Sequence, residues 1–397
     1  MESSAEQRRA SRQQKAAARN RRRLRRILAV VVAAVVLCLA VFLIIKLQKA
    51  EKPAVDPALD TRPKQQIHLA FAGDLNLTRG VIASGENGSY QNVFMDIVPL
   101  LANADLTVLN FEGSAGTAPR GLLTALRSAG VDFMQLANSY AISEGVLGLS
   151  DAIDAVYSAG MEPLGVYKNR AAYQEGKGYT IREVDGVRIA FVAFTKGLDG
   201  MTLPAGSSDC VNILYTDYDS AYQNVNTTRI RTVLDAAAQE EPDLTVVLLH
   251  WGSEYNDTIS ASQEKIRKLL FDRGVDAIIG THPHYVQEMA LSDNGQFIAY
   301  SLGDLYGDAE RSGSEYSVIL DLEVTKTEDD TRITGYTYTP IYTVTEKTGP
   351  VKVLRIREAM HAFEEGYVDR ISQEDYDAMV YALTRIEARI NPPKKEE

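Results

Sequence analysis

Cysteine and histidine are both scarce in this sequence. The chain of 397 residues has two cysteines, Cys38 and Cys210, and five histidines. Cys38 lies inside a long apolar run and Cys210 lies far beyond it, so we predict that the chain forms no intramolecular disulfide. The stability of the folded part must therefore come from core packing. The sequence also lacks internal repeats and, apart from a basic N-terminal stretch, low-complexity runs.

Acidic side chains outnumber basic ones except at the N-terminus. The net charge is −11, and residues 1–26 carry ten Lys or Arg against two Glu, so the rest of the chain carries about −19. The 45% hydrophobic and 24% charged content is typical of a folded protein and argues against wholesale disorder. The length suffices for one large domain or two of ordinary size.

Residues 27–45 form an uninterrupted apolar run without a charged side chain. At about 1.5 Å per residue such a helix is roughly 28 Å long, close to the roughly 30 Å hydrocarbon thickness of a bilayer. The arginines of residues 21–26 outweigh the three lysines of residues 46–52. We therefore predict a single transmembrane anchor with a cytoplasmic N-terminus, and a C-terminal part that faces outward.

Three alternatives for the N-terminal stretch fit the sequence less well than an anchor. A cleaved signal peptide has a shorter apolar region and a small-x-small cleavage site, which residues 46–49 do not offer. Lipid attachment at Cys38 is disfavoured by the bulky Leu37 before it. Beside an apolar span, the arginines favour a role in topology and in attraction to anionic lipid over nucleic-acid binding.

The domain layout that follows has five parts. We expect a basic cytoplasmic tail (1–26), a membrane anchor (27–45), an extended linker (46–66), a folded domain (67–350) and a C-terminal helical extension (351–397). Beyond residue 66, short apolar runs alternate with helical patterns, which predicts an α/β fold with parallel strands and right-handed crossovers. Hairpins are expected over 179–194, on an Asp-Gly turn, and around 293–295.

The individual elements are expected at the following places. Strands are predicted over 67–72, 105–109, 131–136, 246–249, 276–280, 316–325, 333–345 and 352–356. Helices are predicted over 92–102, 120–129, 144–159, 227–240, 260–272, 358–365 and 372–390. Residues 196–224 are polar and irregular, and we expect a surface excursion there that lines or covers a site.

Polar side chains follow five of the expected strands. They are Asp74, Asn110 with Glu112, Asn138, His250, and His282 with His284. Ligands of α/β sheets gather at the carboxyl ends of the strands, so we expect these side chains to converge. A mixed oxygen and nitrogen set without thiolate suits Mn²⁺, Fe or Zn²⁺. Because the set exceeds one tetrahedral site, it favours a dinuclear centre that could activate water for displacement at phosphorus.

Each of these residues also has a purely structural interpretation. Asp74 follows Gly73 and could be a turn residue, and Asn138 could be an ordinary cap. His250 precedes Trp251 and could be a buried, hydrogen-bonded histidine. The His282-Pro283-His284 segment is more specific, because the proline fixes the backbone between the two imidazoles. The coincidence of all of them at strand ends favours the metal site.

Six stretches of the sequence resemble a known family. They read FAGDLNL, VLNFEG, LANSY followed by Glu144-Gly145, LLHWGSEY, IIGTHPHYVQ and YSLGD, between residues 67 and 307. In this order and spacing they resemble the CapA-type capsule synthesis proteins, which are associated with poly-γ-glutamate biosynthesis and export. The resemblance implies a calcineurin-like metallophosphoesterase fold, a four-layer α/β/β/α sandwich, and metal-ligand positions at Asp74, Glu112, Asn138, His250, His282 and His284.

The chain also departs from the family pattern. Where the family has Asn-Asn-His this chain has Asn138-Ser139-Tyr140, so an imidazole expected near the leaving group is missing. Ser143 stands where Asp is common, and Asp304 stands where Asn is usual. Asn76 occupies the place of a histidine in true phosphoesterases.

Two classes of function stay open. The first is a metal-dependent hydrolase or transferase that acts on an anionic envelope polymer or its phosphorylated carrier, with Glu254 or Tyr140 handling protons. A phenol with an ordinary pKa near 10 matches neutral pH poorly, which weakens this class. The second is a binding or scaffolding subunit of a polymer synthase complex. The charge of about −19 opposes a polyanion, so such a ligand needs a metal or a local basic patch.

Overall fold

The computed structural model describes residues 65–85, 87–346, 349–367 and 371–391, all within one compact unit of residues 63–397. The basic tail, the anchor predicted over 27–45 and most of the linker lie outside the described residues. Among the helices that are described, none is long and apolar enough to cross a membrane.

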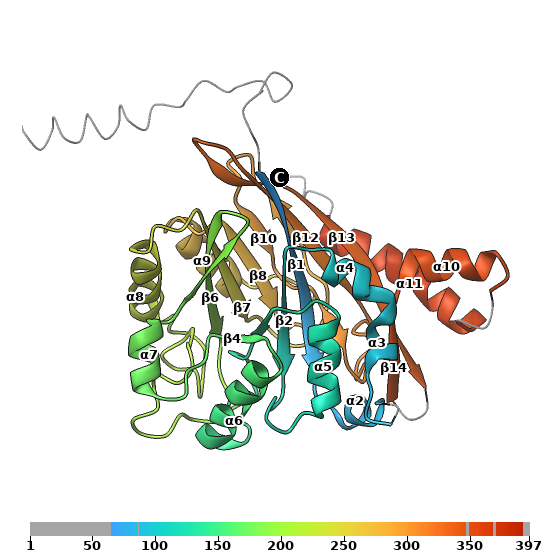
Figure 1. Cartoon of the computed structure of the whole chain (residues 1–397), viewed down its shortest axis with the longest axis horizontal. Helices are drawn as coiled ribbons and strands as arrows, with labels where there is room; N and C mark the ends of the chain where they lie inside the picture. Colours follow the sequence, from blue (N-terminus) through green and yellow to red (C-terminus); the bar gives the residue numbers. More distant parts are fainter. Residues whose placement is uncertain (1–64, 86, 347–348, 368–370, 392–397) are drawn as a thin grey trace, which may run out of the picture. The chain divides into compact units, whose positions relative to one another are not determined.

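Within this part of the chain, the first of two sheets has eight strands (Figure 1). Its order is β14-β13-β12-β1-β2-β3-β4, with β11 beside β1. The strands are β1 (Gln65–Asn76), β2 (Leu106–Glu112), β3 (Phe133–Gln135), β4 (Glu162–Leu164), β11 (Asp304–Tyr306), β12 (Tyr316–Lys326), β13 (Thr331–Glu346) and β14 (Gly349–Arg355). The strands from β1 to β4 pair in parallel, as their alternation with helices predicts.

The second sheet has six strands in the described part, in the order β5-β6-β7-β8-β10-β9. They are β5 (Thr180–Val184), β6 (Val187–Thr195), β7 (Leu244–His250), β8 (Ala277–Thr281), β9 (Met289–Leu291) and β10 (Phe297–Ala299). The central strands β6, β7 and β8 are parallel, and the hairpin on Asp185-Gly186 adds β5 at one edge. Both predicted hairpins are therefore present.

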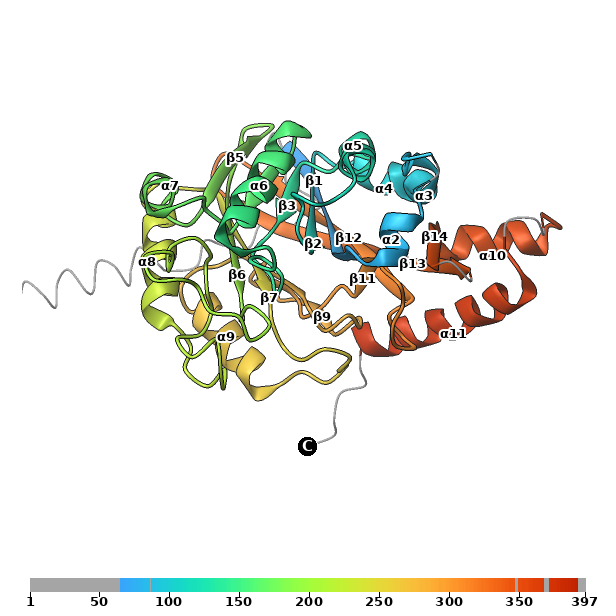
Figure 2. The same cartoon turned by 90° about the horizontal axis from the view of Figure 1, so that it is seen from below.

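Helices cover the outer faces of both sheets. Figure 2 shows α5 (Arg120–Ser128) and α6 (Gly145–Ser158) over the first sheet, and α8 (Thr227–Ala238) and α9 (Ala261–Phe271) over the second. The four layers α/β/β/α match the architecture expected from the sequence. Beyond β14 lie α10 (Ile356–Glu364) and α11 (Gln373–Ile390), which contact β13.

Strand alternation explains how the second sheet is buried on both faces. Phe191 and Leu248 belong to the core between the sheets, whereas Val192 and Leu249 pack against the outer helices. Parallel strands that are buried on both faces have continuous apolar sequences. This is why the runs before His250 and His282 lack the polar-apolar alternation of a half-exposed strand.

A close approach of two glycines brings β11 to β1. A Cβ added to Gly73 would lie 1.8 Å from the carbonyl oxygen of Gly303, so no larger residue fits there. The Asp74 N–H donates to that same oxygen at 3.0 Å. The register shifts between Ala72 and Asp74, and Asp74 stands opposite Asp304. Such a bulge re-aims the side chain that follows it.

Several elements differ from the expectation. The helix predicted over 92–102 is broken into α3 (Gln91–Phe94), a 3₁₀ turn (Met95–Ile97) and α4 (Val98–Ala102). Pro99 lies in the first turn of α4 and cannot donate a helical hydrogen bond, so the chain begins a new helix there. Four further elements were not predicted. The edge strand β4 contains Pro163, which is unusual in a strand. The others, α2 (Arg79–Ala83), α7 (Arg170–Gly176) and β11, are short.

The polar segment 196–224 is irregular, as predicted, but it is not wholly on the surface. Val211 and Leu214 are fully buried, and Ile213 forms a bridge with Thr195. The segment therefore pairs with the carboxyl end of β6.

Candidate metal centre

The polar residues at the strand ends converge on one buried cluster, although the first and last of them are 210 positions apart in sequence. The side chain of Asp74 is fully buried, and its Oδ2 accepts a hydrogen bond from the His282 N–H at 2.9 Å. Its Oδ1 accepts a hydrogen bond from Asn110 Nδ2 at 2.5 Å. The end of β1 is thereby tied to β2 and to the turn after β8.

Glu112 and His250 bring β2 and β7 together. His250 Nε2 lies 2.8 Å from Glu112 Oε1 and 3.1 Å from Ser139 Oγ, while its Nδ1 lies 3.2 Å from Thr281 Oγ1. Despite the short distance, Glu112 Oε1 has no hydrogen bond of good geometry within the described residues. We interpret this contact as proximity of two ligand atoms rather than as a formed hydrogen bond.

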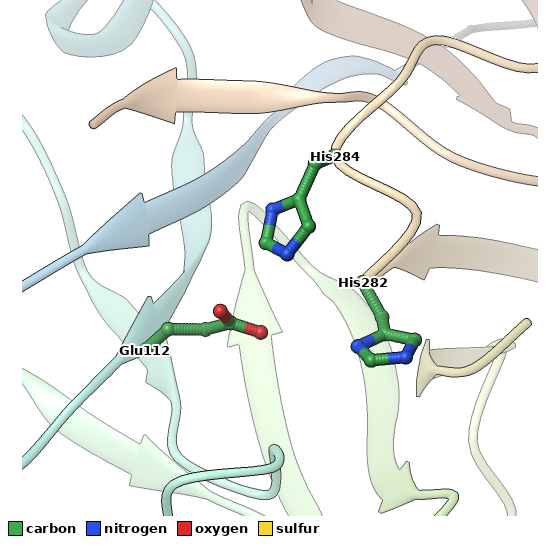
Figure 3. A group of neighbouring side chains, drawn as sticks. All are labelled: Glu112, His282 and His284. Atoms are coloured by element: carbon green, nitrogen blue, oxygen red, sulfur yellow. The ribbon is translucent and has the colours of Figure 1, made fainter. Parts of the chain in front are cut away.

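The His282-Pro283-His284 segment follows β8 and presents two imidazoles to the same space. Figure 3 shows both rings and the carboxylate of Glu112 turned toward one another. Neither histidine has an ordinary backbone conformation, because φ is +93° at His282 and +58° at His284. Non-glycine residues at positive φ are strained, and such strain is commonly kept at functional sites.

Asp304 completes the cluster, although it was not among the predicted ligands. Its Oδ1 lies 2.7 Å from His284 Nδ1, and its side chain is buried. The sequence held a signal for it, since Asp304 ends the YSLGD stretch. What sequence reasoning missed is the pairing of β11 with β1, which places this carboxylate next to Asp74.

The charges of the cluster are strongly perturbed by burial. Burial raises the pKa of Glu112 to about 8, and burial with the neighbouring Glu112 raises the pKa of Asp74. Burial lowers the pKa of His250 and of His282, so both imidazoles are neutral and able to bind a cation. Burial also disfavours the charged form of His284, but Asp304, Glu112 and Asp74 together raise its pKa to about 11.

These residues fit a divalent metal. Three groups have ligand atoms within 4.8 Å of one another: Glu112 with His282 and His284, Asp74 with Glu112 and His250, and Asp74 with His284 and Asp304. In addition, His282 Nδ1 is buried without a hydrogen-bond partner among the described residues. Buried, unpaired donor atoms are costly unless something binds them. A buried His/Asp/Glu cluster of this kind could hold a metal ion.

Asn138, the remaining predicted ligand, lies at the edge of the cluster. Its Nδ2 donates to the carbonyl oxygen of Phe111 at 2.6 Å, and its Oδ1 accepts from the Tyr140 N–H at 3.0 Å. In this arrangement the amide connects β2 to the turn that carries Tyr140. Its role as a ligand stays a prediction.

A pocket of about 310 Å³ opens onto the cluster. Its wall includes Tyr140 and Glu254, the two predicted catalytic residues, together with Glu112, His284 and Asp304. Burial and the neighbouring Glu112 raise the pKa of Tyr140 to about 12. Glu254 also lines a second pocket of about 240 Å³ beside His282.

Fold and site together define a layered α/β protein with a buried carboxylate and imidazole cluster at the carboxyl ends of its strands. The chain belongs to the family described as bacterial capsule synthesis protein PGA_cap, whose model matches residues 68–309. This confirms the resemblance inferred from the six sequence stretches.

Two curated relatives were compared along most of the chain. The capsule biosynthesis protein CapA of Bacillus anthracis is 27% identical over 286 residues, which are 68% of this chain and 66% of the relative. This chain thus spans just under two thirds of that relative. The PGA biosynthesis protein CapA of Bacillus subtilis is 23% identical over 300 residues, which are 72% of this chain and 74% of the relative.

Among solved structures, the calcineurin-like phosphoesterase YfkN from Bacillus subtilis is similar with a TM-score of 0.44 and 12% identity, over 81% of this chain and 100% of that one.

Proposed function

We propose that this chain is a metal-dependent hydrolase that acts in the synthesis or export of an anionic capsule polymer of the poly-γ-glutamate type. The names of the Bacillus relatives support the polymer context. The single observation that carries the hydrolase proposal is the trio of overlapping ligand groups at the base of an open pocket. A purely structural cluster would not need to line a pocket.

A dinuclear centre of Mn, Fe or Zn is the cofactor that we propose. Asp74, Glu112 and His284 each belong to two of the three ligand groups, so shared ligands could hold two ions side by side. Bound there, the ions would supply an activated water and charge stabilisation for displacement at phosphorus.

The chain's own residues would position the substrate and move protons. Glu254 stands in the pocket wall and would accept a proton from the attacking water. Tyr140, with its pKa raised to about 12, keeps its proton at neutral pH and would donate a hydrogen bond to the leaving group.

We also propose that residues 27–45 anchor the protein in the cell membrane, with the catalytic domain outside. The run is apolar for 19 residues and the arginines precede it. This placement would bring the site next to a polymer synthase in the same membrane, whose subunits are the proposed partners.

A second candidate function is a binding or scaffolding subunit that keeps the metal site without turnover. Tyr140 favours it, because a phenol that resists ionisation replaces the family imidazole and is a weak general acid at neutral pH.

The test is metal content and hydrolysis of the purified full chain. With Mn²⁺ we expect bound metal and hydrolysis of a generic phosphodiester or of polyglutamate. We expect His282→Ala to lower turnover about 100-fold or more, because it removes a ligand. The matched control is His361→Ala, an exposed histidine on α10. Absence of both metal and turnover, or full activity in His282→Ala, would refute the hydrolase; metal without turnover would favour the binding subunit.

A further inference from the structure

Apart from the histidines and one lysine, the charged side chains that line the two pockets beside the metal cluster are all acidic. Asp308 and Glu310 line the larger pocket together with the cluster carboxylates, and Asp199 and Glu254 line the smaller one. Among the described residues that line either pocket, Lys196 is the one lysine, and there is no arginine. An anionic substrate that entered this site would meet repulsion everywhere except at the cluster itself and at Lys196.

Lys196 lies at the point where β6 ends and the irregular segment begins. Its Nζ donates to the carbonyl oxygen of Gly252 at 2.8 Å and lies 4.7 Å from the centre of the Tyr222 ring. These contacts hold the ammonium group in the wall of the smaller pocket, which Ser139 and His282 also line. The fold therefore fixes the position of the Lys196 ammonium group, unlike that of a lysine on the open surface.

The third contact of Lys196 is with the cluster. Its Nζ lies 3.3 Å from His282 Nε2, while His282 Nδ1 is buried without a partner in the described part of the chain. If Nδ1 binds a metal ion, the neutral ring carries its proton on Nε2 and can no longer accept from Lys196. One of the three ammonium donors then becomes available for another acceptor in the pocket.

We propose that Lys196 is the substrate-binding residue that holds an oxyanion of the substrate beside the metal cluster. The ligand chemistry is a phosphoryl or carboxylate oxygen, which a carrier or the polymer itself would provide. This inference rests on the proposed function, because it assumes that the cluster holds a metal ion. The need for a positive charge among the acidic side chains of the pockets applies equally to a binding subunit. Lys196 would also be the local positive charge that a polyanionic ligand requires in this negatively charged protein.

The test measures anion binding rather than turnover. The full chain, purified in detergent and loaded with Mn²⁺, is titrated by calorimetry with inorganic phosphate and with a short glutamate oligomer, and its metal content is measured by mass spectrometry. The variants are Lys196→Met, which removes the charge, and Lys196→Arg, which keeps it. Lys265→Met, on the exposed face of α9, is the matched control.

We expect Lys196→Met to weaken binding of one of the two anions roughly 10- to 100-fold, the range for loss of a charge-assisted hydrogen bond, with metal content unchanged. The anion affected identifies the source of the oxyanion. Lys196→Arg should retain most of the affinity. Should Lys196→Met fail to fold, Lys196→Gln carries the test, because its amide can still donate to Gly252 without a charge.

Equal affinity of wild type and Lys196→Met for both anions would overturn the assignment, as would a wild-type protein that binds neither. If the chain holds no metal and hydrolyses nothing, yet binds an anion through Lys196, the hydrolase proposal fails and the assignment of Lys196 stands.

Discussion

At the scale of single residues, protons offset the negative charge of the buried carboxylates when no metal is bound. Glu112, Asp74 and Asp304 all have raised pKa values because of burial, and His284 is held in its charged form by these carboxylates. A divalent cation would replace the protons. The cluster should therefore bind metal more tightly as pH rises, because the ligands are then ionised at a lower cost.

The raised pKa of Glu112 should make the stability of the metal-free protein depend on pH. Its pKa is 4.5 ordinarily and about 8 in the folded state. Between these values the folded protein keeps a proton that the unfolded chain loses, so the metal-free protein loses stability as pH rises. We predict that metal-free Glu112→Gln melts about 2 to 5 °C above wild type at pH 8, and that the gap closes toward pH 4.5.

Thermal unfolding in EDTA across this pH range checks the prediction. Glu175→Gln, on the exposed face of α7, is the control and should track wild type. With Mn²⁺ present the order should reverse, because Glu112→Gln lacks a ligand. A pH-independent gap would show that Glu112 is ionised in the fold.

At the scale of elements, the C-terminal helix α11 contacts the wall of the site. This helix follows the region that the family model matches, which ends at residue 309. Arg385 and Arg389 of α11 lie 3.3 and 3.4 Å from Asp257 Oδ2. The guanidinium of Arg389 also lies over the ring of Tyr285, at 4.7 Å from its centre. These contacts connect α11 to the loop between β7 and α9, which carries Glu254.

We predict that Arg389→Met loosens this loop. The side chain of Arg389 is 10% exposed and that of Asp257 is 39% exposed, so the change removes a partly exposed ion pair and a cation–π contact, at a cost of about 1 kcal/mol. Hydrogen exchange should rise over residues 252–258 and leave β7 unchanged. Arg273→Met, which breaks a pair with Asp235, is the control and should leave the loop as it is. Unaltered exchange in Arg389→Met would mean that the loop holds its own conformation.

At the scale of the whole molecule, we predict that residues 27–45 decide where the chain is found. A variant that lacks residues 1–52 should move from the membrane fraction to the soluble fraction, because it has lost the apolar run. The control lacks residues 1–20 and should stay in the membrane, since it keeps the run and the arginines next to it. Protease added outside intact cells should digest the C-terminal domain. Retention of the 1–52 deletion in the membrane would indicate another means of attachment.

Much of the fold was predictable because its signals are local. Continuous apolar runs marked the buried parallel strands β7 and β8, helical spacing marked α6 and α9, and the Asp-Gly turn marked the hairpin of β5 and β6. The elements that were missed are short or contain proline. The stability of the missed strands β4 and β11 comes from pairing with neighbouring strands more than from their own residues.

The sequence by itself determined the element order, the family and the residues that gather at the strand ends, because residue type and spacing carry this information along the chain. The tertiary structure alone decided that Asp304 joins Asp74, that Lys196 faces His282, and that α11 braces the loop of Glu254. These pairs are separated by 230, 86 and more than 100 positions. No local preference joins residues so far apart; sheet pairing and close packing of the backbone do.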